Sequence, residues 1–176
     1  MSRCFGMKFF LLGIILAGCG ADGDATSAIG AAAAAEEADS FGICQMLTDE
    51  QVDTVLTDHD GGEVAHAGGS MMEGVDSYQC SYTSDTDDGY SVLALVVSVA
   101  SSPELLARIR PSNFLYGEDD RVDIADGAFV NDKMDGELGI TVIKGLHKID
   151  LDLSSEDAHS LRQEMLGLAA TVAGQL

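Results

Sequence analysis

Apolar and polar residues alternate along the second half of the chain, in the manner of strands that bury only one face. In the segment 146–153 the positions 149, 151 and 153 are apolar, and the positions between them carry Lys148, Asp150 and Asp152. A period of two residues predicts a β-strand with one buried and one exposed face. Alternation or a valine-rich apolar run predicts four further strands, at 78–82, 90–100, 122–130 and 138–143.

Turn-forming residues separate the predicted strands. The run from Asp85 to Gly89 joins the first two strands into a hairpin, and Lys144-Gly145 provides a tight turn before the last strand. Asp126-Gly127 is a candidate break inside 122–130. Between 58 and 74, glycines, acidic residues and histidines interrupt any period, so we expect a loop there.

Three segments carry the signals of helices. Thr48 followed by Gln51 is a capping-box pattern, with apolar residues at 52, 55 and 56. Ser102 and Pro103 form an N-cap and a first helical residue, which predicts a short helix that ends before Pro111. The C-terminal segment opens with acidic residues near 155 and repeats apolar residues at helical spacing: Leu161, Met165, Leu168 and Val172.

Together these elements predict a single α+β domain over 41–176 with two layers. An antiparallel sheet of about five strands is expected to pack on a long C-terminal helix and on shorter N-terminal helices. The apolar stripe of the last helix would cover the inner face of the sheet. A domain of about 135 residues is large enough to bury a substantial core.

The N-terminal eighteen residues have the organisation of an export signal. Arg3 and Lys8 precede a short apolar stretch at 9–17, which is too short to span a bilayer as a stable anchor. The stretch ends in Leu16-Ala17-Gly18-Cys19, which resembles the lipobox of bacterial lipoproteins. We therefore interpret 1–18 as a lipoprotein signal peptide and Cys19 as the thiol that receives the lipid. Several acyl chains at one residue would hold the protein stably at a membrane.

The segment 19–40 is predicted to be the lipidated N-terminus and a flexible tether. It is rich in alanine and glycine and lacks an apolar period. Attachment through a lipid at Cys19 would place the domain in the cell envelope. Gly20 follows the cysteine, in place of the aspartate that retains lipoproteins at an inner membrane, so the outer membrane is favoured in a two-membrane envelope.

Two of the four cysteines remain for the folded domain. Cys4 belongs to the signal and Cys19 carries the lipid, which leaves Cys44 and Cys80. An even pair in an exported chain predicts a disulfide, because oxidising compartments favour it.

The net charge of the chain limits the classes of partner that it can bind. Thirty acidic and nine basic residues give a formal charge of −21. Arg3 and Lys8 leave with the signal, so the processed chain carries about −23. A surface of this sign repels phosphate backbones, which excludes nucleic acid as a partner. An acidic surface of this kind is typical either of adaptation to high salt or of a protein that attracts cations or basic partners.

One loop contains residue types that bind metals. His59, Asp60, Glu63 and His66 are the weak candidates, as two histidines and two acids can bind zinc or copper. Their spacing matches no helical metal motif, and solvated loop residues are the competing interpretation. The Asp85 to Gly89 turn departs from a calcium loop, because glycine is its fifth residue and the twelfth position is Val96.

A set of short motifs links the folded part, 44–176, to a known group. The pattern resembles the small disulfide-paired bacterial lipoproteins of unknown function best known from actinobacteria. The resemblance implies an envelope location and a non-enzymatic domain. It rests on these residues: Cys44 and Leu47-Thr48-Asp49-Glu50, Cys80 and Tyr82, the run Ile124-Ala125-Asp126-Gly127-Ala128-Phe129-Val130, Gly139, Lys144-Gly145, and the amphipathic C-terminal helix.

The sequence predicts binding rather than catalysis. Gly68-Gly69-Ser70 begins like a nucleophile elbow but lacks the closing glycine, so an envelope hydrolase is the least favoured function. We expect a lipid-anchored binding or accessory domain without a cofactor, which contacts an envelope protein or an unknown small molecule. The alternative is a metal-binding or metal-sensing lipoprotein that uses the loop from Asp58 to His66.

Overall fold

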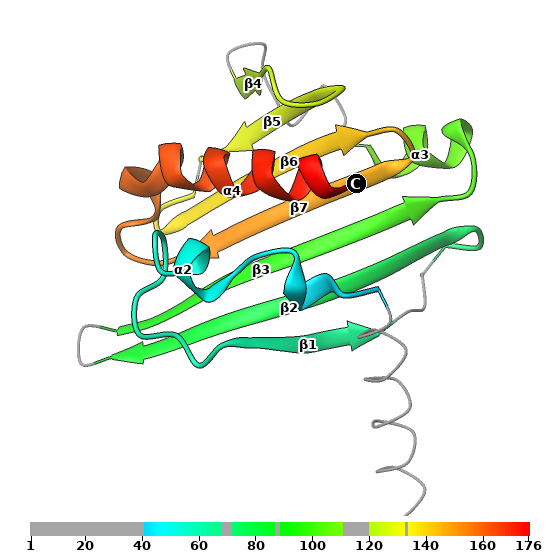
Figure 1. Cartoon of the computed structure of the whole chain (residues 1–176). Helices are drawn as coiled ribbons and strands as arrows, with labels where there is room; N and C mark the ends of the chain where they lie inside the picture. Colours follow the sequence, from blue (N-terminus) through cyan, green and yellow to red (C-terminus); the bar gives the residue numbers. More distant parts are fainter. Residues whose placement is uncertain (1–40, 68–71, 87–88, 111–119, 133) are drawn as a thin grey trace, which may run out of the picture.

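The computed structural model describes residues 41–67, 72–86, 89–110, 120–132 and 134–176 (Figure 1). The predicted signal, the lipidation site Cys19 and the tether lie outside this part. In chain order the elements are the 3₁₀ helix η1 (Ile43–Gln45), α2 (Asp49–Val52), β1 (Gly62–Ala67), β2 (Val75–Thr86), β3 (Gly89–Ala100), α3 (Pro103–Ile109), β4 (Arg121–Val122), β5 (Gly127–Asn131), β6 (Glu137–Lys144), β7 (His147–Ser154), the 3₁₀ helix η3 (Ala158–Leu161) and α4 (Arg162–Gln175).

The strands form one antiparallel sheet in the order β1-β2-β3-β7-β6-β5-β4. The α+β class, the antiparallel sheet and the long C-terminal helix of the sequence analysis are confirmed. The expectation of about five strands was wrong in detail, because the described residues form seven.

The two additional strands have separate causes. β1 lies where a loop was expected and pairs with the outer edge of β2, with a register shift between Val64 and His66. The predicted strand 122–130 is divided into β4 and β5 by a turn in which Ala125 has φ 52°. Asp126 holds this turn in place, because its Oδ2 accepts a hydrogen bond from the Gly145 N–H at 2.6 Å.

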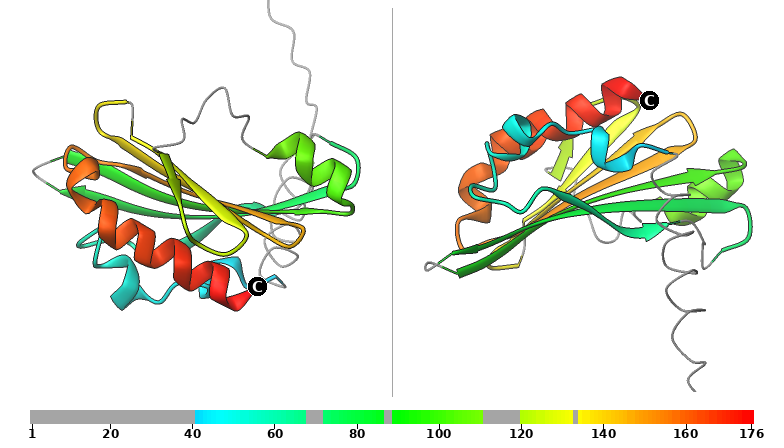
Figure 2. Two further views of the ribbon diagram at one scale, coloured as in Figure 1. Left: turned by 90° about the horizontal axis from the view of Figure 1, so that it is seen from above. Right: turned by 60° about the horizontal axis from the view of Figure 1, so that its bottom comes forward.

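One face of the sheet is covered by α4 and by the segment that contains η1 and α2 (Figure 2). Met165, Leu168 and Val172 of α4 belong to the same buried cluster as Leu151 and the other inward residues of β7. The stripe predicted from the sequence therefore covers the inner face of the sheet, as expected.

The expectation of two layers was incomplete, because α3 lies on the opposite side of the sheet from α4 (Figure 2). Leu106 of α3 packs in a second cluster with Val75, Ala100 and Ile143. These strand residues face away from α4, so α3 covers one end of that face. Within the described ranges, no other helix packs on it.

The predicted disulfide between Cys44 and Cys80 is present, with an S–S distance of 2.07 Å. It joins η1 to β2, and the hydroxyl of Tyr82 donates a hydrogen bond to the Cys44 carbonyl at 3.0 Å. These two links attach the N-terminal segment to the sheet.

The start of α3 gives a testable prediction. The Ser102 hydroxyl accepts a hydrogen bond from the Leu105 N–H at 3.3 Å, which satisfies one free donor of the first helical turn. Ser102→Ala should lower the free energy of unfolding by about 1 kcal/mol in urea denaturation. Ser102→Asn retains a capping oxygen and is the control. Equal losses for both variants would contradict the capping role.

Candidate ligand-binding site

The part of the sheet that α4 does not face and α3 leaves uncovered is called the open face here. β7 contributes Lys148, Asp150, Asp152 and Ser154 to it, because these residues alternate with the buried ones. The register places Asp152 between Ala94 of β3 and Gly139 of β6. Both neighbours are small, so the surface is hollowed around Asp152.

The hollow is a cavity of about 280 Å³ at the end of β7 that lies away from α3. Val92 and Ala94 of β3 form an apolar wall together with Met134, a methionine that is 57% exposed. Glu137 and Asp152 supply carboxylates. The cavity therefore combines an apolar surface with negative charge.

Gly139 allows the Asp152 carboxylate to lie against the backbone of β6. A Cβ atom at position 139 would stand 2.7 Å from Asp152 Oδ1, closer than real Cβ contacts allow. The side chain keeps solvent contact, but this position brings its carboxylate against the cavity wall.

A polar chain on β6 and β7 engages the neighbouring carboxylate. The Thr141 hydroxyl donates to Asp150 Oδ1 at 2.7 Å, and Lys148 Nζ lies 2.7 Å from Asp150 Oδ2. Both oxygens of Asp150 are thus occupied. Among the described residues, no cation forms an ion pair with Asp152.

This environment changes the acidity of Asp152. Partial burial and the nearby Asp150 carboxylate raise the pKa of Asp152 from 3.8 to about 6, with Lys148 opposing the shift and Glu137 adding to it. A carboxyl that is costly to ionise beside an apolar cavity is a feature of binding and active sites.

The raised pKa predicts how stability depends on pH. The folded state holds the Asp152 proton more tightly than the unfolded state, so the stabilisation is full below about pH 4 and is lost as the pH rises through 6. Asp152→Asn should therefore match the natural chain near pH 3.5 and have a higher Tm at pH 7.5. Because the group is partly solvated, the gain should be about 1 kcal/mol or less.

The measurement is thermal unfolding of both chains across this pH range. Glu164→Gln, on the exposed surface of α4, removes the same charge elsewhere and is the matched control. A Tm difference for Asp152→Asn that does not change with pH would contradict the assignment.

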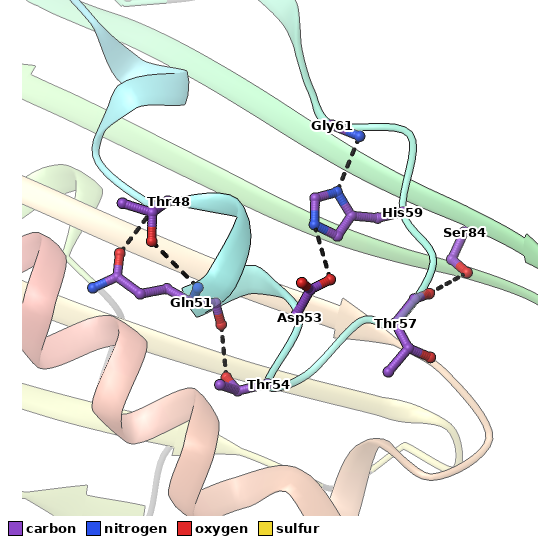
Figure 3. A network of polar contacts seen from close by, with 8 residues as sticks. All are labelled: Thr48, Gln51, Asp53, Thr54, Thr57, His59, Gly61 and Ser84. Atoms are coloured by element: carbon purple, nitrogen blue, oxygen red, sulfur yellow. Dashed lines mark hydrogen bonds and ion pairs between the residues drawn. The ribbon is translucent and has the colours of Figure 1, made fainter.

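Figure 3 shows the His59 ring between the Gly61 amide and the Asp53 carboxylate. The His59 side chain is only 4% exposed and packs edge-on against the ring of Tyr82. Nδ1 accepts a hydrogen bond from the Gly61 N–H at 3.0 Å, and Nε2 lies 3.4 Å from Asp53 Oδ1. Both ring nitrogens are engaged, so His59 stabilises the segment between α2 and β1.

Among the described side chains, the other metal candidates form no group of three or more ligands with His59. Asp60 and Glu63 are exposed, and Glu63 lies within β1. His66 is also in β1, and the position of its side chain lies outside the described part of the chain. No group of three or more metal-ligating side chains occurs within the described ranges. No observation here favours the metal-binding alternative.

Sequence reasoning placed Asp152 on the exposed face of its strand but did not identify it as a site residue. The feature that distinguishes it is the pair of small neighbours, Ala94 and Gly139, which come from two other strands. Alternation shows which side of a strand a residue occupies, whereas cross-strand neighbours depend on register.

Comparison with known proteins places the chain in no family. No family model, no curated protein and no solved structure matches it. In the part of the chain that the structure describes, no helix is long and apolar enough to cross a membrane.

Proposed function

We propose that this protein is a lipid-anchored lipoprotein of the cell envelope whose domain binds a ligand without transforming it. The observation that supports binding is the cavity on the open face, beside a sheet whose other face is closed by α4. A rigid antiparallel sheet holds the lining residues of β3, β6 and β7 in fixed register, which suits a preformed site.

Anchoring is supported by the sequence up to Cys19 and by the disulfide. The Leu-Ala-Gly-Cys tetrapeptide follows a short apolar stretch, and a Cys44–Cys80 bond suits an oxidising compartment. The segment 19–40 would connect the anchor to the folded domain.

The anchoring proposal predicts a processed chain that begins at a lipid-modified Cys19. Mass spectrometry of protein from bacterial membranes should show an acylated N-terminal cysteine. Cys19→Ser should leave the chain unprocessed or shift it to the soluble fraction. An unmodified N-terminus elsewhere in the sequence would refute the proposal.

The binding proposal is tested by a ligand screen that compares the natural chain with a variant whose cavity is filled. The full chain in detergent is screened by NMR against small molecules of different charge, alongside Ala94→Leu, which fills the cavity with apolar atoms. Ligands that bind the natural chain but not the variant, and that are recovered unchanged, would support the proposal. Conversion of such ligands to products, or equal binding to both chains, would overturn it.

A further inference from the structure

The cavity on the open face has an uneven distribution of charge. Glu137 and Asp152 stand on neighbouring strands, β6 and β7, while β3 offers the apolar side chains of Val92 and Ala94. The nearest lysine on β7, Lys148, lies 2.7 Å from Asp150, so its charge is directed to that carboxylate. The cavity therefore combines a negative end with an apolar wall.

From this arrangement we propose that the cavity binds a small organic amine, with its ammonium group at Asp152 and its apolar part against Val92, Ala94 and Met134. The inference rests on the proposed binding function and names the class of ligand. An ammonium group donates charge-assisted hydrogen bonds to a carboxylate, and the partial exclusion of water strengthens them.

The dimensions of the cavity suit a ligand of modest length. Its volume of about 280 Å³ is near the lower end of the range for small-molecule sites. An amine with a short alkyl chain suits a cavity of this size. Burial of the alkyl chain against Val92, Ala94 and Met134 would stabilise the complex through the hydrophobic effect.

Other ligand classes fit less well. An anion would be repelled by the carboxylates of Glu137 and Asp152 and by the overall charge of the chain, which is formally −21. A divalent cation needs several converging oxygen ligands, whereas both oxygens of Asp150 are already engaged by Thr141 and Lys148. A monovalent ammonium group needs only a carboxylate and space beside it.

Binding of the amine should depend on pH through Asp152. The charged groups that face it are Asp150 and Lys148 on β7 and Glu137 on β6, while β3 presents only apolar residues at the cavity. Since the pKa of Asp152 is raised to about 6, its proton must leave before it can attract a cation. Affinity should increase as the pH rises from 5 to 7.5.

The experiment is a titration of the full chain in detergent with butylammonium chloride, followed by NMR, with a detergent-only titration subtracted. The probes 1-butanol and butyrate match its size but are neutral and negative. We expect butylammonium to bind at least tenfold more tightly than either. Asp152→Asn and Ala94→Leu should each reduce its affinity at least tenfold. Glu164→Gln removes a charge on α4 and should leave the affinity unchanged.

Each outcome has a defined meaning. Equal affinity for butylammonium and 1-butanol, or full affinity in Asp152→Asn, would overturn the amine proposal. If the screen finds neutral or anionic ligands that Ala94→Leu excludes, the binding function stands and the amine proposal fails. If no ligand distinguishes Ala94→Leu from the natural chain, both proposals fail.

Discussion

Replacing Leu151 with alanine should lower the free energy of unfolding by about 3–4 kcal/mol. Leu151 is fully buried on β7, at the centre of the sheet, where it is paired in register with Leu95 of β3 and Ile140 of β6. It belongs to the core cluster that includes Met165 of α4. The truncation leaves a cavity that rigid strands on both sides can fill only in part.

Urea denaturation of the natural chain and of Leu151→Ala measures this loss. Met134→Ala is the control, because Met134 is largely exposed and its truncation should change stability by less than about 0.5 kcal/mol. A loss in Leu151→Ala no larger than that of Met134→Ala would show that α4 does not cover this part of the sheet.

Removal of the Cys44–Cys80 disulfide should have an effect of similar size. The bond closes a loop over a sequence separation of 36, so its loss should cost about 4 kcal/mol in the chain-entropy account. Cys80 is fully buried, and replacement of both cysteines by alanine avoids leaving a single reactive thiol in the core.

The double variant Cys44→Ala, Cys80→Ala should unfold at a lower urea concentration than the oxidised natural chain. The natural chain under reducing conditions should move in the same direction, which separates loss of the bond from loss of side-chain packing. Unchanged stability in the reduced chain would contradict a stabilising role for the disulfide.

The central and C-terminal elements were predictable because their residues follow simple periods. β7 alternates strictly, and Leu161, Met165, Leu168 and Val172 repeat at the spacing of a helix. Capping residues were equally informative, since Thr48 and Ser102 both form the predicted hydrogen bonds. In these elements local sequence and tertiary packing favour the same structure.

The elements that sequence reasoning missed depend on tertiary context. β1 has Val64 as its one large apolar residue, and its main-chain pairing with β2 gives a strand where the flanking glycines and acidic residues indicated a loop. The side of the sheet on which α3 lies follows from its contacts with Ala100 and Ile143, which stand far apart in the sequence. The cavity beside Asp152 could not be predicted for the same reason, because its lining residues come from four strands, β3, β5, β6 and β7, and from the turn before β6.

The junction between β3 and β7 has a consequence for the rate of folding. β2 with β3, and β6 with β7, are local hairpins whose short turns can close early. The sheet becomes continuous only when eight residue pairs form between β3 and β7, from Val92 with Ser154 to Val99 with His147, which are 48 to 62 residues apart in the sequence. Closing such a loop costs entropy before the pairing repays it, so joining the two hairpins should limit the folding rate. Until it occurs, both hairpins present unpaired edges to their neighbours, and during this interval the chain is most prone to aggregate.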